Sequence, residues 1–121
     1  MDELIEHLAD KVGLDRAVAG RTIGIILGFL RNEGPTDKVQ TLIDRIPGAE
    51  ALIDSAGSKA GISRLMGGGV IGLGVKLMGL GLGMAEIKSV ARELFKYGRD
   101  QLGADEMSEI IAATPGLSQF S

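Results

Sequence analysis

The sequence predicts an all-α protein, a small helical domain built from two tandem three-helix repeats with a Gly-rich central helix. The apolar residues are mainly Leu, Ile, Val, Ala and Met, with three Phe, one Tyr and no Trp, which favours helices over a β-sandwich. Apolar residues also recur at spacings of three and four, the period of one helix face. The 121 residues suffice for a single domain, residues 1–121, with a modest core.

The first repeat unit, residues 1–48, contains three predicted helices separated by glycine and proline. Gly13 is placed to end the first helix at its C′ position. Asp15 is a suitable N-cap for a long second helix, and the apolar middle of that helix places it at the centre of the fold. The expected helices are, in order, Met1 to Val12, Asp15 to Glu33, and Thr36 to Ile46.

Residues 49–64 are expected to connect the two units. Ala49 to Ala56 suggests one or two further helical turns, and residues 57–61 begin and end with glycine, which suits a linker.

The second unit, residues 65–121, repeats the plan of the first at a shift of 68 positions (81 minus 13). Gly13-Leu14 recurs as Gly81-Leu82, and Pro47-Gly48 recurs as Pro115-Gly116. Helical phase also agrees across about forty residues, which indicates a tandem repeat. In this register the following pairs are equivalent: Ala17 and Ala85, Ile26 and Leu94, Leu27 and Phe95, Phe29 and Tyr97, Arg31 and Arg99, Val39 and Met107, Leu42 and Ile110, and Ile43 and Ile111. The long helix of this unit is predicted over residues 84–102 and its last helix over residues 104–113.

Leu65 to Met84 is expected to form the first helix of the second unit. Its apolar stripe consists of Met66, Val70, Leu73, Leu77, Leu80 and Met84. Nearly half of the stretch is glycine, and each glycine within a helix costs roughly 0.5–1 kcal/mol relative to alanine. Such a helix is tolerable only if another element packs against the exposed backbone.

Glycines at four-residue spacing on the first long helix are the candidate partner for this stretch. Gly20, Gly24 and Gly28 form a stripe that lets another helix approach closely. We expect that stripe to receive the Gly-flanked face of residues 65–84, although contacts between two copies of the chain are the alternative. The predicted helix-packing or self-association residues are Gly20, Gly24, Gly28, Gly67, Gly72, Gly74, Gly79 and Gly81.

A row of basic residues on the second long helix is a candidate anion-binding face. Lys88, Arg92 and Lys96 occupy the positions equivalent to the glycine stripe, and Arg99 extends the row. A solvated surface is the simpler interpretation. The functional alternative is contact with anionic lipid, whereas a net charge of −3 and the lack of interleaved aromatic residues argue against nucleic acid.

Catalytic and cofactor motifs are absent from the sequence, so we expect neither an enzyme nor a bound cofactor. Residues 67–72 match the string G-x-G-x-x-G, but no strand pattern precedes them. His7 is the only histidine, there is no cysteine, and no Ser/His/Asp arrangement stands out. Residues 65–84 are long enough for a membrane span, but Lys76 at their centre argues against one.

The pattern of helix-ending residues in this chain resembles that of bacterial proteins of unknown function of the VcgC/VcgE type. The likeness lies in the Gly-Leu starts, the central amphipathic helix, the Pro-Gly closures and the Gly-rich middle. It implies a small helical bacterial protein and transfers no catalytic residue. The acidic, amphipathic start is unlike a signal peptide, so a cytoplasmic location is expected. The predicted function is a non-enzymatic helical scaffold or self-associating module that binds itself or another protein, and the alternative is a peripheral protein on a membrane surface.

Overall fold

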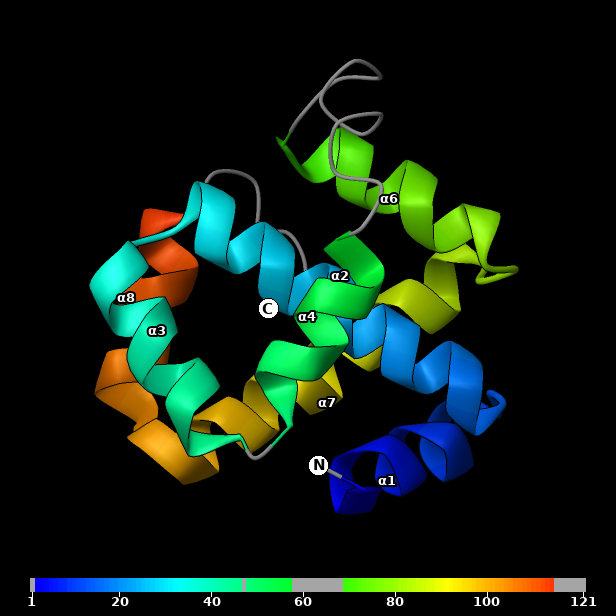
Figure 1. Ribbon diagram of the computed structural model, residues 1–121, viewed down its shortest axis with the longest axis horizontal. Helices are drawn as coiled ribbons and strands as arrows, with labels where there is room; N and C mark the ends of the chain where they lie inside the picture. The colour runs from blue at the N-terminus through cyan, green and yellow to red at the C-terminus, as the bar shows by residue number, and fades with distance from the viewer. Residues whose placement is uncertain (1, 47, 58–68, 115–121) are drawn as a thin grey trace.

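The computed structural model describes residues 2–46, 48–57 and 69–114, and within them the chain is all-helical (Figure 1). No strand occurs among these residues. The helices are α1 (Asp2–Val12), α2 (Arg16–Glu33), α3 (Thr36–Arg45), α4 (Ala49–Gly57), α6 (Gly69–Gly79), α7 (Met84–Leu102) and α8 (Ala104–Ala113).

The long helix α2 lies at the centre, as its apolar middle predicts. It contacts α1, α3, α4, α6 and α7. Helix α7 in turn packs against α1, α3, α6 and α8. Most contacts between helices therefore involve one of the two long helices. In Figure 1, α3 and α8 lie side by side at one end of the molecule, and α1 and α6 lie toward the other end.

The ends of α1 and α6 share one capping geometry. Gly13 and Gly81 have φ values of +80° and +95°, a backbone conformation that disfavours residues with a Cβ atom. The leucine that follows each glycine donates its backbone N–H back into the helix: Leu14 to the Ala9 carbonyl at 3.0 Å and Leu82 to the Leu77 carbonyl at 3.3 Å. The Gly-Leu pairs in the sequence therefore mark two equivalent helix ends.

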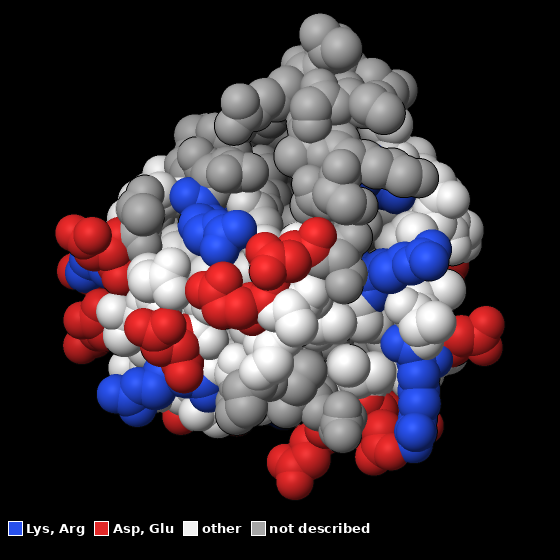
Figure 2. Space-filling model, in the orientation of Figure 1, with Lys and Arg blue, Asp and Glu red and all other residues white. Residues whose placement is uncertain are grey.

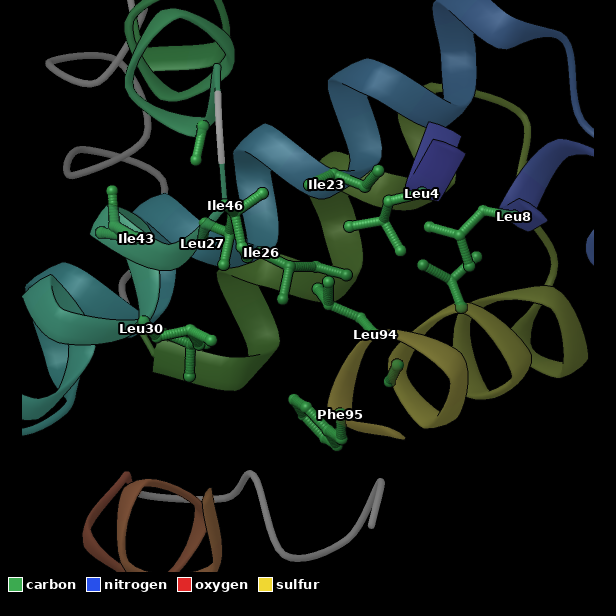
Figure 3. Packing of buried hydrophobic residues seen from close by; sticks show 14 of the residues in the cluster. Leu4, Leu8, Ile23, Ile26, Leu27, Leu30, Ile43, Ile46, Leu94 and Phe95 are labelled. Carbon is green, nitrogen blue, oxygen red and sulfur yellow. The ribbon is translucent and has the colours of Figure 1, made fainter. Parts of the chain in front are cut away.

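Apolar side chains from all seven described helices form one core, part of which Figure 3 shows. Leu4 and Leu8 of α1 and Leu94 and Phe95 of α7 lie in the same interior as the buried face of α2. The buried residues of α2 and α3 that Figure 3 labels are Ile23, Ile26, Leu27, Leu30 and Ile43. The spacing of these residues on each helix is the pattern that the sequence analysis used to predict one buried face.

The helical turns expected at Ala49 to Ala56 are present as helix α4, in which Ala49 and Ile53 are buried one turn apart in the core. One predicted boundary is wrong. The Gly-rich helix does not continue to Met84. It ends at Gly79, and Met84 is instead the first residue of α7, since Gly81 turns the chain between the two helices. Residues 65–68 of that predicted helix lie outside the described part of the chain.

Candidate interaction surfaces

The glycine stripe of α2 is covered by α4. A Cβ atom added at Gly20 would lie 3.5 Å from Leu52 Cδ2 of α4, and one added at Gly28 would lie 3.7 Å from Ile53 Cγ2. Gly24, between them, is also buried. The predicted partner of Gly20 and Gly28, the Gly-rich segment, is therefore corrected to α4. Helix α6 does contact α2, but α4 occupies these two positions.

Polar side chains of α2 and α3 hold α4 at the edge of this contact. The Glu50 carboxylate of α4 accepts hydrogen bonds from Arg31 of α2 at 3.3 Å and from Gln40 of α3 at 3.1 Å. An ion pair that is partly exposed contributes little stability.

Gly74 and Gly79 of α6, and Gly81 just after it, border open space rather than a neighbouring helix. A Cβ atom added at Gly74, Gly79 or Gly81 would meet no atom within 4 Å. Gly67 lies outside the described residues, and the surroundings of Gly72 are likewise not described. The predicted close packing at Gly74, Gly79 and Gly81 is thus absent within the described chain.

Exposed apolar side chains occur on α6 beside these glycines and at the start of α7. Val75 and Met78 of α6 and Met84 at the start of α7 are 49%, 50% and 52% exposed. On the opposite side of α6, Leu77 is fully buried. The outward side of α6 and the start of α7 therefore present large apolar groups beside glycines. We call Gly74, Val75, Met78 and Gly79 the α6 face.

The four basic residues predicted to form an anion-binding face are all exposed on α7. Lys88, Arg92 and Lys96 follow one another at four-residue spacing, and Arg99 lies on the same side. Within the described residues none of the four forms an ion pair. On the face of the molecule shown in Figure 2, by contrast, acidic and basic side chains are interspersed.

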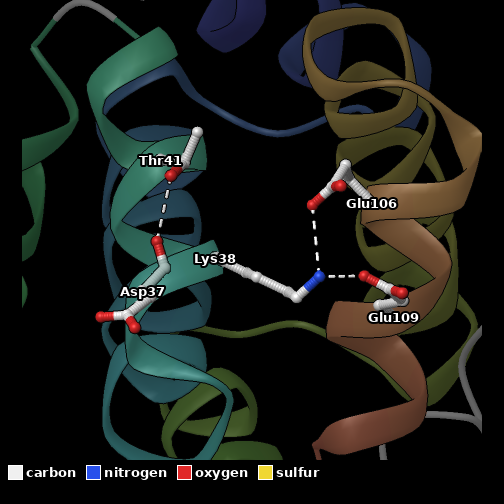
Figure 4. A network of polar contacts seen from close by, with 5 residues as sticks. All are labelled: Asp37, Lys38, Thr41, Glu106 and Glu109. Carbon is white, nitrogen blue, oxygen red and sulfur yellow. Dashed lines mark hydrogen bonds and ion pairs between the residues drawn. The ribbon is translucent and has the colours of Figure 1, made fainter.

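An ion-pair cluster that the sequence analysis did not identify joins α3 to α8 (Figure 4). The Lys38 ammonium of α3 donates to the carboxylates of Glu106, at 3.4 Å, and of Glu109 on α8. On the same helix, the Thr41 hydroxyl donates to the Asp37 carbonyl at 3.0 Å. The three-residue spacing of Glu106 and Glu109 could have marked them as one helix face, but their partner lies 68 and 71 positions away.

The hydrogen bond to Glu109 is the main cause of a raised pKa at Lys38, and the bond to Glu106 adds to it. Because folding raises this pKa above the ordinary value of 10.5, the stability that the cluster contributes is present below that pH. It is lost as the pH rises through the folded-state pKa.

Raising the pH from about 9.5 to about 11.5 should lower the urea midpoint of the wild type more than that of the Lys38→Met variant. The reason is that the variant lacks this titrating group. Chemical unfolding followed by circular dichroism measures the difference. Lys11→Met, at an exposed lysine of α1, is the control. An equal decline in the wild type and the Lys38→Met variant would contradict the expectation.

The remaining candidate groups are His7 and the acidic side chains. His7 of α1 is exposed and hydrogen-bonded to Glu93 of α7 at 3.4 Å. Among the described residues, no group of His, Asp and Glu side chains is arranged to hold a metal ion. No described helix is both long enough and apolar enough to cross a membrane.

Comparisons with known proteins found no match. No protein-family model matches the sequence. No curated protein matches it, and no solved structure matches the fold. The class that the structure defines is therefore an all-helical protein with an exposed apolar face on α6 and an exposed basic side on α7.

Proposed function

We propose that this protein is a non-enzymatic helical scaffold that associates with itself through the α6 face. The observation that carries the proposal is that Val75 and Met78, three residues apart on α6, are exposed beside glycines where an added Cβ atom would meet no atom within 4 Å. Large apolar groups that cluster on a surface mark interaction sites more often than single ones do. Glycines beside them allow the backbone of a second helix to approach closely.

We further propose that the chain is a tandem repeat of a three-helix unit packed about a pseudo-two-fold axis. The helix bounds support this, because α2 and α7 start 68 positions apart (84 minus 16) and α8 reproduces both bounds of α3 at the same shift. One pair of contacts is reciprocal, as such an axis requires: α1 packs on α7, and its equivalent α6 packs on α2. Equivalent helices also meet each other, α2 with α7 and α3 with α8.

Burial follows the same register. Leu27 and Phe95 are both buried, as are Leu42 and Ile110. Gly83, at the start of α7, occupies the position of Asp15 at the start of α2. This agreement supports two units of one ancestry.

Replacing Val75 and Met78 together with serine should convert the self-associated protein to the monomer, because it removes the apolar groups that the proposed contact buries. Size-exclusion chromatography with light scattering, over a range of protein concentrations, measures the mass. The control carries serine at Ala51 and Ala112, which are exposed on other helices. A wild-type mass equal to that of the monomer at every concentration would refute self-association.

A second candidate function is peripheral binding to an anionic membrane. One observation favours it: Met84 continues the four-residue spacing of Lys88, Arg92 and Lys96, so an apolar group adjoins a basic row on one side of α7. Basic residues near a membrane surface each add about 1 kcal/mol of attraction to anionic lipids, and apolar side chains beside them enter the interface.

In a flotation assay, this second candidate requires the protein to rise with phosphatidylglycerol vesicles and to stay behind with phosphatidylcholine vesicles. Added salt should weaken the binding. Met84→Ser should reduce the floated fraction several-fold, whereas Ala112→Ser should leave it unchanged. Equal recovery with both lipids, or none with either, would exclude this function.

A further inference from the structure

The contact between α2 and α4 defines a seat for a helix. Its floor is the glycine stripe, where Leu52 and Ile53 of α4 lie over Gly20 and Gly28. Its polar edge is Arg31 with Gln40, both of which donate hydrogen bonds to Glu50 of α4. A helix bound there therefore has an apolar inner side and an acidic residue at the edge.

The equivalent surface of α7 has no helix on it among the described residues. At the shift of 68 positions, Gly20 and Gly28 correspond to Lys88 and Lys96, and Arg31 corresponds to Arg99. Gln40 corresponds to Ser108, which keeps a hydrogen-bonding group at this position. These four side chains of the second unit are all exposed. The polar edge of the seat is thus retained, while its floor has changed from glycine to lysine and arginine.

Charge is divided between two sides of α7. Glu86 and Glu93 lie on the side that faces away from the basic row, and Glu93 contacts His7 of α1 at 3.4 Å. Helix α1 therefore packs along the acidic side. The basic side, with Lys88, Arg92, Lys96 and Arg99, has no ion-pair partner in the described part of the chain.

We propose that the basic side of α7 binds an acidic amphipathic helix of a partner protein, in the position that α4 occupies on α2. Complementary charge selects such a helix, because a floor of three cations at four-residue spacing matches carboxylates at the same spacing. A helix fits better than a nucleic acid, since the equivalent seat on α2 already holds one and the row has no aromatic side chain on which bases could stack. This surface is separate from Val75 and Met78, so the inference goes beyond self-association.

The test uses the full-length protein and a fluorescein-labelled helical peptide of about 18 residues, long enough to form a helix. Its glutamates recur every four residues along one side, and leucines flank them. A control peptide of the same composition has its glutamates distributed around the helix. Fluorescence anisotropy should show saturable binding of the first peptide that weakens with salt, and binding of the control at least about tenfold weaker.

Charge reversal then locates the binding surface. Arg92→Glu with Lys96→Glu should weaken binding of the first peptide by about tenfold or more, and Arg99→Gln should weaken it several-fold. Lys11→Glu with Arg45→Glu, two exposed basic residues on α1 and α3, changes the net charge equally and should have less than about a twofold effect. Circular dichroism checks that every variant is folded.

Other occupants of the surface give different results. No binding of the first peptide, equal binding of both peptides, or equal losses in the two double variants would overturn the proposal. So would tighter binding of a single-stranded oligodeoxythymidine or of phosphatidylglycerol vesicles than of the first peptide, in assays where the Arg92→Glu/Lys96→Glu variant loses that binding. If the Arg92→Glu/Lys96→Glu variant kept the self-associated mass of the wild type, the basic side of α7 would be distinct from the α6 face.

Discussion

Replacing Phe95 with alanine should lower the free energy of unfolding by about 3–5 kcal/mol. Phe95 of α7 is 1% exposed and belongs to the buried apolar core (Figure 3). Truncation removes its transfer free energy and leaves a cavity that rigid helices fill only in part. Urea unfolding followed by circular dichroism measures the loss, and Phe95→Leu gives a milder version for a protein that tolerates little destabilisation.

The matched control is Lys96→Ala, one position along α7, where an exposed side chain is removed. Its expected effect is within about 0.5 kcal/mol of zero. Leu27→Ala, at the equivalent position on α2, should cost about 2–5 kcal/mol. A loss of less than about 1 kcal/mol for Phe95→Ala would mean that the two long helices do not pack around this side chain.

Replacing Gly20 with leucine should destabilise the protein by about 1–3 kcal/mol, because the new side chain displaces α4. The added Cβ atom itself is tolerable, at 3.5 Å from Leu52 and 3.6 Å from Ile5. Gly20→Ala should therefore be neutral or stabilising by up to about 1 kcal/mol, since alanine favours a helix over glycine. Alanine at position 20 should therefore leave the stability unchanged or raise it, whereas leucine should lower it.

Gly74→Leu is the control for this pair. An added side chain at Gly74 meets no atom within 4 Å, so leucine should raise stability slightly through helix propensity. Thermal unfolding measures all three variants. If Gly20→Leu and Gly74→Leu had the same effect, α4 would not be seated on the glycine stripe.

The Gly74 comparison also bears on the proposed self-association. Gly74 belongs to the α6 face, so Gly74→Leu should keep the monomer stable and yet reduce the self-associated mass. A variant that alters assembly without altering stability would separate the contact between copies from the packing within one chain.

Local chemistry made much of the fold predictable. Gly13 and Gly81 end helices because each adopts a positive φ, and this preference belongs to the residue itself. The predicted starts at Met84 and Ala104 agree with α7 and α8. The spacing of apolar residues likewise predicted the buried side of α2, since a helix repeats every 3.6 residues whatever packs on it.

The choice of partner for each helix depended on the tertiary structure. The glycine stripe is compatible with any close-packing helix, and only the path of the chain after Gly48 brings α4 to it. The same limit hid the pairing of Lys38 with Glu106 and Glu109, which depends on how α3 and α8 meet.

The sequence by itself determined where most of the helices begin and end and which side of them is apolar, because these follow from backbone preferences and periodicity within a few turns. The tertiary structure decided that Val75, Met78 and Met84 are left exposed, although the sequence placed Met84 on a buried stripe. It also decided that α4 covers Gly20 and Gly28 while Lys88 and Lys96 stay uncovered among the described residues. The physical reason is that burial is a property of contacts between distant segments, and neither spacing nor composition specifies which segments meet.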